Sequence, residues 1–344
     1  MLRRLPHALL LLLATVALAA CGGGSAPDDD RVERPAPTVT DPDAPPPAPA
    51  LDAAAQRAAR HALAGRRGGV AALDLRDGRI VVLTGSGGGS ATRDAVPPGS
   101  TLKTLLGGLA LEEGLIDADG PLDGDMPAAP GADNYRGVRL GPLTLAQALA
   151  HSSNTAFSHV AVALGAARIE AGLRRGGWGS PVEVDLPPTR LAASVANVAE
   201  PIGPDGRYVD VDELQRTTVL QLALLAAAVA GDGTVPRPWL AQRPPRASGG
   251  RLWRAAVARE LRRGLRLAVT DGTGAAMDDP RLAIAGKTGT VRLPDGAIQA
   301  STIAFAPFAR PRWALAVSLR ANPDQTGGTA AAPIAREVLK ALAG

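Results

Sequence analysis

The chain has 344 residues, a formal net charge of +4 and a pI near 9.8. Its arginines are scattered and only 3% of its residues are aromatic, so the sequence shows no stacking platform or basic stripe for nucleic acid, and we expect no nucleic-acid partner. A single cysteine excludes a disulfide within the chain, and four histidines leave little for a metal centre. We therefore expect no metal and no cofactor.

Residues 1–20 have the features of an export signal: a basic start and an apolar run over 8–20 that is too short to span a bilayer comfortably. The stretch LAACG at 18–22 resembles the lipobox of bacterial lipoproteins, which implies cleavage before Cys21 and its lipidation. Gly22 stands where an aspartate would mark inner-membrane retention in enteric-type bacteria. We expect an exported lipoprotein of the outer membrane facing the periplasm, or otherwise of the outer leaflet of the cytoplasmic membrane.

Residues 21–51 contain the predicted lipid-bearing cysteine and a segment rich in proline, aspartate and alanine. Because this segment has little to bury, we expect a disordered, partly polyproline tether. Residues 52–344 carry frequent apolar runs and are predicted to form one folded domain. It begins with a helix over 52–64, with Asp52 as its N-cap, followed by a β-hairpin around the turn at 76–78.

The middle of this domain is predicted to be mainly helical and its C-terminal part to be strands. Helices are expected from Ser100 to about Gly114 and within 143–165 and 217–233, where the apolar spacing is three and four and each segment ends in glycine. Strands are expected over 282–291, 297–308 and 312–320, before a last helix over 329–342. The hairpin and these strands would form one antiparallel sheet flanked by helices, with the helical middle as an inserted subdomain, which is an α+β fold.

Three short polar motifs interrupt these elements. Only three of the 37 basic residues are lysine, and Lys103 lies three positions after Ser100, on the same helical face. A serine hydroxyl needs a base to become a nucleophile, and a lysine, unlike an arginine, supplies a neutral amine when its surroundings disfavour charge. A solvated surface lysine is the plain alternative.

The other two motifs are Ser152-Ser153-Asn154, at a break in the helical pattern, and Lys287-Thr288-Gly289-Thr290, on a predicted strand. Polar triplets such as the first are usually caps or turns. In the second, Gly289 leaves room for a substrate backbone beside the strand, with Lys287 supplying charge. A nucleotide-binding P-loop would need glycine at 281, where the chain has Arg281.

Together, Ser-x-x-Lys, Ser-x-Asn and Lys-Thr-Gly in this order resemble the active-site set of penicillin-binding proteins and serine β-lactamases. Further stretches, among them GGVAALDLRDGRIVVL, PGSTLKTLLGGLALEEG, GLRLAVTDGTG and NYRG, resemble the transpeptidase domain of high-molecular-weight penicillin-binding proteins over roughly residues 66 to 342. The resemblance implies a penicillin-binding-protein/β-lactamase-like fold. It also implies a D,D-transpeptidase that acts on D-Ala-D-Ala stem peptides of peptidoglycan and is acylated by β-lactams.

The family's roles carry over onto the matching positions. Ser100 would be the acylated nucleophile, Lys103 its base and Ser152 a proton relay. Substrate would be held by Asn154 and by the last motif, whose members are Lys287, Thr288, Gly289 and Thr290. The oxyanion hole would be the backbone N–H groups of Ser100 and Thr290. Two lysines in one cleft repel each other, which lowers at least one pKa.

Some features depart from the family's relatives. Leu102 replaces the usual aromatic residue before the motif lysine, a change that we expect to affect packing only. Neither Glu170 nor Glu200 lies in the E-x-x-x-N pattern of the class A deacylating base, and Ser-x-Asn disfavours class D, so slow penicillin hydrolysis is expected. No glycosyltransferase segment is recognised, so we expect no glycan polymerisation. A D,D-carboxypeptidase and a non-catalytic sensor remain alternatives, and protein partners are not indicated.

Overall fold

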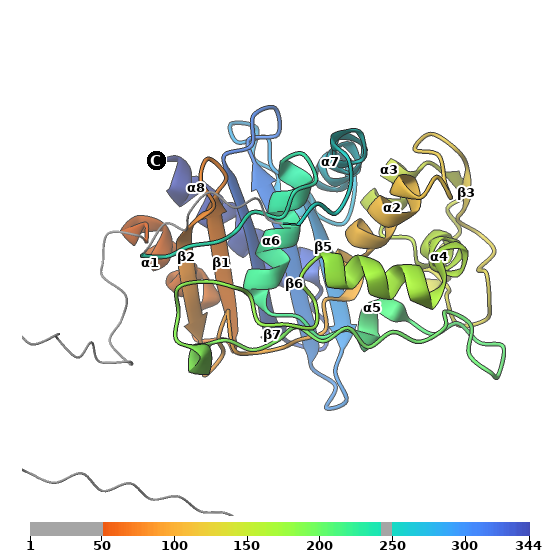
Figure 1. The fold of residues 1–344 in the computed structure, drawn as a ribbon, viewed down its shortest axis with the longest axis horizontal. Coiled ribbons are helices and arrows are strands. Elements are labelled where there is room, and N and C mark those ends of the chain that lie inside the picture. The colour runs from red at the N-terminus through yellow and green to blue at the C-terminus, as the bar shows by residue number, and fades with distance from the viewer. Residues whose placement is uncertain (1–50, 242–249) are drawn as a thin grey trace, which may run out of the picture. The chain divides into compact units, whose positions relative to one another are not determined.

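The computed structural model describes residues 51–241 and 250–344; the predicted signal segment, Cys21 and all of the tether but Leu51 lie outside them. Figure 1 shows the described elements. The main helices are α1 (Ala53–Leu63), α2 (Lys103–Glu112), α3 (Leu145–Ala150), α4 (Asn154–Arg175), α5 (Val211–Leu214), α6 (Val219–Ala230), α7 (Ala255–Thr270) and α8 (Ala332–Ala343). The strands are β1 (Gly68–Asp74), β2 (Arg79–Ser86), β3 (Leu122–Asp123), β4 (Pro142–Leu143), β5 (Ala285–Arg292), β6 (Ile298–Ala306) and β7 (Trp313–Ala321).

Five of the strands form one antiparallel sheet in the order β2-β1-β7-β6-β5. Val70 of β1 lies between Thr84 of β2 and Val317 of β7, so the N-terminal hairpin joins the C-terminal strands through the β1–β7 pair. This confirms the predicted sheet. Strand β5, which carries the Lys-Thr-Gly motif, is an edge strand, so one row of its backbone groups has no neighbouring strand.

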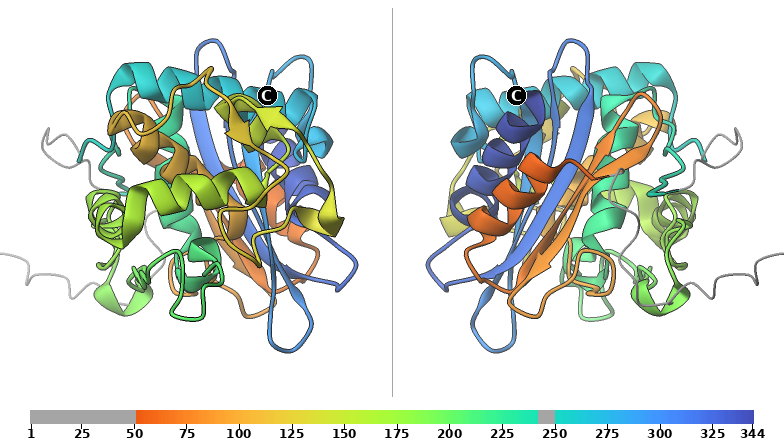
Figure 2. Two further views of the ribbon diagram at one scale, coloured as in Figure 1. Left: turned by 90° about the vertical axis from the view of Figure 1, so that its right-hand side faces the viewer. Right: turned by 90° about the vertical axis from the view of Figure 1, so that its left-hand side faces the viewer.

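Helices cover both faces of the sheet (Figure 2). Helices α1 and α8 pack against each other and on one face, where alternate residues such as Leu315 and Val317 of β7 point toward them. The intervening residues Ala314 and Ala316 point to the opposite face and its larger core. Because residues of both faces are covered, β7 is apolar at every position but Ser318 and Arg320, and buried at all but Arg320.

The sequence predicted that the helical middle of the chain packs beside the sheet. Part of it instead lies on the sheet. Helix α6 lies directly on the face formed by β1, β6 and β7, and all twelve of its residues are buried (Figure 1). Helix α6 is apolar at every position but Gln221, and a helix that is apolar on nearly all sides is surrounded by protein. Helices α2, α3 and α4 form the neighbouring layer, with α4 on α2 and α3 on α7.

One predicted helix boundary was wrong. The segment 143–165 contains two helices, and α4 continues beyond Gly165 to Arg175 with only a kink at that glycine, whose φ is +68°. Because Ile169 and Leu173 remain buried, the apolar stripe continues past the glycine and packing overrides its tendency to end the helix. The N-cap Asp52 of α1 is as predicted, since its Oδ1 accepts a hydrogen bond from the N–H of Ala55 at 2.8 Å.

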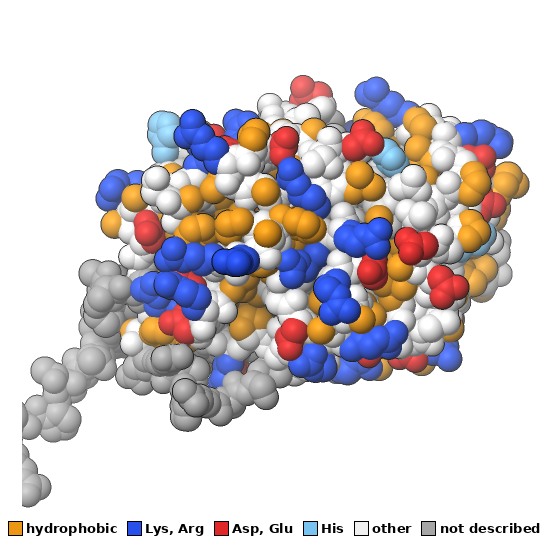
Figure 3. Space-filling model, turned by 90° about the horizontal axis from the view of Figure 1, so that it is seen from above, with side chains coloured by type: hydrophobic (Ala, Val, Ile, Leu, Met, Phe, Trp, Pro, Cys, Tyr) orange, Lys and Arg blue, Asp and Glu red, His pale blue; other side chains and the backbone are white. Residues whose placement is uncertain are grey.

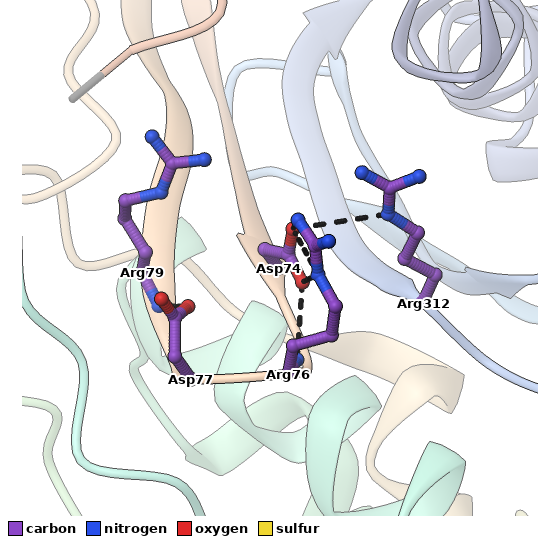
Figure 4. A network of polar contacts seen from close by, with 5 residues as sticks. All are labelled: Asp74, Arg76, Asp77, Arg79 and Arg312. Atoms are coloured by element: carbon purple, nitrogen blue, oxygen red, sulfur yellow. Dashed lines mark hydrogen bonds and ion pairs between the residues drawn. The ribbon is translucent and has the colours of Figure 1, made fainter. Parts of the chain in front are cut away.

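A network of polar contacts around a buried aspartate lies at the end of β1 (Figure 4). The carboxylate of Asp74, only 2% exposed, accepts hydrogen bonds from the backbone N–H of Arg76 at 3.0 Å and from its guanidinium at 2.5 to 3.1 Å. The guanidinium of Arg312 approaches to 3.9 Å. Burial by itself raises the pKa of Asp74, but the bonds and charges of these arginines outweigh it, and the pKa is lowered.

On the face shown in Figure 3, basic side chains are interspersed with acidic and apolar ones. Among residues 51–241 and 250–344, no helix combines the length and apolar character needed to cross a membrane.

Candidate active site

The Ser-x-x-Lys motif lies on a tight turn followed by a helix. Ser100 is in the single 3₁₀ turn η1 (Gly99–Thr101), and α2 begins at Lys103, so the predicted helix starts with a tighter turn than expected. The carbonyl of Pro98 accepts a hydrogen bond from Thr101 Oγ1 at 2.8 Å, which fixes the turn. Leu102 is fully buried within the core, in keeping with a role in packing.

Lys103 points into the protein and is only 3% exposed. Its Nζ donates hydrogen bonds to Asn154 Oδ1 at 2.5 Å and to the carbonyl of Ser152 at 3.2 Å, and lies 5.8 Å from the centre of the Phe157 ring. The Ser-x-Asn motif therefore holds the amine of the Ser-x-x-Lys motif. Within the described chain Ser100 itself makes no side-chain hydrogen bond, and the residue is partly exposed.

Ser152 lies in the gap between α3 and α4 with a φ of +56°, a conformation that is uncommon for a residue with a side chain. Ser153 caps α4: its Oγ accepts from the N–H of Ala156 and donates to Asn134 Oδ1 at 2.8 Å. The cap reading of this triplet is thus correct for Ser153. The strained backbone turns Ser152 toward both lysines, and strain of this kind is commonly found at functional sites.

Lys287 extends from the edge strand β5 and is fully buried. Its Nζ donates to Ser152 Oγ at 2.7 Å and to the carbonyl of Thr288 at 2.9 Å. Ser152 thus connects the two lysines, since its carbonyl accepts from Lys103 and its hydroxyl oxygen from Lys287. Sequence segments more than 130 positions apart meet at this residue.

The threonines of the last motif take different positions. Thr290 is exposed, and its Oγ1 accepts from the N–H of Gly327 at 2.9 Å. Thr288 is buried and its Oγ1 bonds Thr273 Oγ1 at 2.7 Å. Thr273 is exposed on the loop after α7, in the stretch GLRLAVTDGTG, and was not predicted as a site residue.

The structure shows what a side chain on Gly289 would meet. A Cβ at this position would lie 2.5 Å from the carbonyl oxygen of Pro98 and 3.1 Å from the side chain of Thr101. The missing side chain therefore makes room for the turn that carries Ser100, and its predicted role beside a substrate backbone stays a prediction. A Cβ on Gly99 would likewise lie 3.2 Å from the backbone nitrogen of Thr290, so the two segments predicted to form the oxyanion hole are adjacent.

Burial and charge act together on the two amines. Burial lowers the pKa of Lys103, and the negative charges of Asp212 and Asp210 oppose this shift. Burial and then the charge of Lys103 hold the pKa of Lys287 well below its usual range, with Asp212 again opposing. The predicted repulsion between the lysines is present, although burial is the larger cause.

Asp212 on α5 is the ionisable group that the sequence analysis missed. It is 5% exposed, and burial together with the charge of Asp210 raises its pKa to about 8, against the effect of both lysines. The only sequence signal was a cluster of acidic residues at 210–213 before an apolar helix, which usually indicates a helix cap. Asp210 does cap α5 in this way.

The fold brings all three motifs together at one site. Comparison with known proteins identifies the family to which the chain belongs. Residues 68–340 match the penicillin binding protein transpeptidase domain family. The chain belongs to this family. Its curated relatives include the peptidoglycan D,D-transpeptidases PbpA of Mycobacterium tuberculosis and Mycolicibacterium smegmatis, at 30% and 28% identity; each match covers 73% of this chain. The matched part spans 56% of the length of these relatives.

Solved structures of the family agree with this fold. Penicillin-binding protein A from M. tuberculosis, in its penicillin G acyl-enzyme complex, is 26% identical, with a TM-score of 0.71 over 86% of this chain and 80% of that one. The D,D-transpeptidase domain of a peptidoglycan glycosyltransferase from Eggerthella lenta is also 26% identical, with a TM-score of 0.71 over 85% and 81% of the two chains. The predicted α+β, penicillin-binding-protein-like fold is therefore confirmed.

Proposed function

We propose that this chain is a serine D,D-transpeptidase that cross-links peptidoglycan stem peptides and forms a covalent ester with penicillin. The observation that carries the proposal is the position of Ser152 between two buried lysines, with the partly exposed Ser100 on the adjoining turn. A buried amine next to a serine is the arrangement that activates a hydroxyl without a histidine. The curated relatives named D,D-transpeptidase and the acyl-enzyme structure support it.

The reaction follows from these positions. Ser100 Oγ attacks the carbonyl between two D-alanines, its proton passes to Lys103 Nζ, and the backbone N–H groups of Ser100 and Thr290 stabilise the oxyanion. The C–N bond breaks as the leaving D-alanine nitrogen receives a proton through Ser152. Lys287 donates to Ser152 Oγ, so the hydroxyl proton of Ser152 is directed elsewhere, toward the leaving group. Ser152 regains its proton from Lys103, which becomes neutral again. An acceptor amine then attacks the ester carbonyl and gives a proton to Lys103, and the C–O bond breaks as this proton returns to Ser100 Oγ.

Substrate recognition is assigned to the remaining motif residues. Thr290 and Thr273 are exposed at the edge strand, where the carboxylate of the terminal D-alanine would meet hydroxyl groups backed by Lys287. Asn154 uses its Oδ1 for Lys103 and its Nδ2 for the carbonyl of Asp133 at 3.1 Å. It therefore orients Lys103 in the free protein, and its second Nδ2–H group and second Oδ1 lone pair remain for a substrate amide.

Intact-mass measurement after penicillin treatment tests the covalent step. Wild type should gain one adduct that lasts many minutes, Ser100→Ala should gain none, and Ser180→Ala, an exposed serine outside the site, should behave as wild type. Folded wild type without an adduct would contradict the proposal and indicate a non-catalytic member. Rapid adduct loss with steady penicillin turnover would indicate a β-lactamase instead.

Incubation with purified muropeptides distinguishes the reactions by which the acyl-enzyme ester can be resolved. Cross-linked dimers among the products establish a transpeptidase, because an amine has resolved the acyl-enzyme. Shortened monomers without dimers establish a D,D-carboxypeptidase, in which water resolves it. The same incubation with Ser100→Ala must give neither product.

We propose in addition that Cys21 is lipidated and anchors the domain to the outer membrane, on the periplasmic side. The support is the sequence alone: the apolar run, the LAACG stretch and the proline-rich segment between Cys21 and α1. Membrane fractionation should place wild type with the outer membrane and release Cys21→Ser to a soluble fraction. Unchanged partition of Cys21→Ser would contradict the anchor without affecting the enzymatic proposal.

A further inference from the structure

The sheet face that α6 covers changes from apolar to polar toward the turn between β5 and β6. Alternate residues of β6 and β7 point to this face, and the paired Ile303 and Ala316 belong to the apolar core under α6. Further along the same face the strands carry Gln299, Ser301 and Ser318, all of which are buried. Buried polar side chains on apolar strands lower stability unless they are paired, so this cluster requires an explanation.

The cluster is paired at every position but one. Gln299 Nε2 donates to Ser318 Oγ at 2.8 Å, and Ser318 Oγ lies 2.7 Å from Ser301 Oγ. Gln299 Oε1 accepts no hydrogen bond from the part of the chain that the structure describes. Gln299 and Ser318 line a cavity of about 290 Å³. The unpaired oxygen is therefore available to a molecule in this cavity.

Charged groups of both signs also line the cavity. Arg67 and Arg320 supply two guanidinium groups, and Asp94 supplies a carboxylate. Asp94 Oδ2 accepts from the backbone N–H of Ser90 at 3.2 Å and lies 3.5 Å from Arg67 Nη2, while Arg320 also pairs with Asp295. The side chains of both arginines and of Asp94 are partly exposed, so a ligand can reach their charges.

The rest of the lining limits the size and character of a ligand. Val96, Val219 and Leu293 form an aliphatic part of the wall, and no aromatic side chain is among the described lining residues. The volume is at the lower end of the range for sites that hold drug-sized molecules, so the ligand is smaller than these. Val219 begins α6, and the N-terminal end of a helix favours a negative group.

We propose that this cavity binds a small zwitterion of the amino-acid class. Its carboxylate is recognised by Arg67 and Arg320, its ammonium group by Asp94 and Gln299 Oε1, and its side chain lies against the aliphatic wall. A neutral sugar offers no charge to these groups, and a simple anion offers no donor to Asp94 or Gln299. None of the three active-site motifs contributes a lining residue, so the site is separate from that of the proposed acylation.

Titration calorimetry with D-alanine, L-alanine and glycine tests the site; D-alanine is included because the proposed reaction releases it. Asp94→Asn and Arg67→Gln should each weaken binding about tenfold, the effect of one charge-assisted hydrogen bond. Arg292→Gln removes an exposed arginine next to the β5–β6 turn that does not line the cavity, and should bind as wild type. Acetate and methylamine, which carry one charge each, should bind at least about tenfold more weakly than the amino acids.

Each contrary result overturns the inference in a recognisable way. Wild type that binds none of the amino acids has a cavity for water only. Unchanged binding by folded Asp94→Asn and Arg67→Gln proteins places the amino acid elsewhere, for example at the active site, and acetate that binds as tightly as the amino acids indicates an anion site. The titration does not require acylation, so wild type that penicillin never acylates would overturn the proposed function and leave this inference standing.

Discussion

Two buried aspartates have pKa values that are shifted in opposite directions. One lies in a structural network at the end of β1, and the other lies at the candidate active site. Asp74 and Asp212 are 2% and 5% exposed, so surface exposure alone does not distinguish them. The pKa of Asp74 is lowered because the bonds and charges of Arg76 and Arg312 outweigh the effect of burial, whereas burial and then the charge of Asp210 raise the pKa of Asp212 to about 8. Arginine partners therefore make Asp74 a structural ion pair, and no donor among the described residues reaches Asp212 Oδ1.

The difference has a functional meaning. The Asp74 network lies at the end of β1 and can be fully satisfied, because arginine donors reach it from the hairpin turn and from the segment before β7 (Figure 4). The residues around Ser100 leave charges incompletely paired, which costs stability but leaves amines whose proton affinity is adjustable. Substitutions in each region test whether the two are as different as their contacts indicate.

The largest effect is expected from Lys103→Arg. Arginine keeps the positive charge but cannot become a neutral base near pH 7, so acylation by penicillin should slow by at least about 10²-fold. Stopped-flow acylation rates measure this, with Lys340→Arg, an exposed lysine on α8, as the matched control. Near wild-type acylation by a folded Lys103→Arg protein would show that this amine is not the base.

Asp74→Asn should affect stability and not acylation. The amide keeps part of the hydrogen bonding but loses its charge-assisted character, so the free energy of unfolding should fall by about 1–3 kcal/mol at neutral pH. The folded-state pKa is lowered, so this difference from wild type is present above about pH 4 and disappears as the pH falls through the folded value. Urea unfolding across pH 3 to 8 checks it; a pH-independent difference would show that the carboxylate charge is not the stabilising feature.

Asp212→Asn should have the opposite effect on stability, and a smaller one. The folded-state pKa of Asp212 is raised to about 8, so the stability that its protonated form confers is lost as the pH rises from about 4 through about 8. The asparagine variant escapes this loss and should be more stable by about 1 kcal/mol above pH 8, with no gain below pH 4. Thermal unfolding at pH 5 and pH 9 measures the gain, and a variant less stable than wild type at pH 9 would contradict it.

The sequence predicted those elements that depend on residues close to one another in the chain. The Asp52 cap, the β1–β2 hairpin and the C-terminal strands follow from the preferences of individual residues and from apolar spacing. The end of α4 was mispredicted, since Gly165 signals a stop locally while Ile169 and Leu173 gain more by continued burial. The position of α6 on the sheet was not predicted either, because it depends on packing between segments that are far apart in the sequence.

The sequence by itself determined which residues are candidates for the reaction: Ser100, Lys103 and Lys287 are identifiable because few lysines occur and their spacing matches a family pattern. Only the tertiary structure decided how they work together. Ser152, whose φ is positive, accepts hydrogen bonds from both lysines, and Gly289 makes space for the turn that carries Ser100. Asp212 owes its raised pKa first to burial on α5, which packs against the distant turn of Ser100, and desolvation depends on distance in space and not on order in the chain.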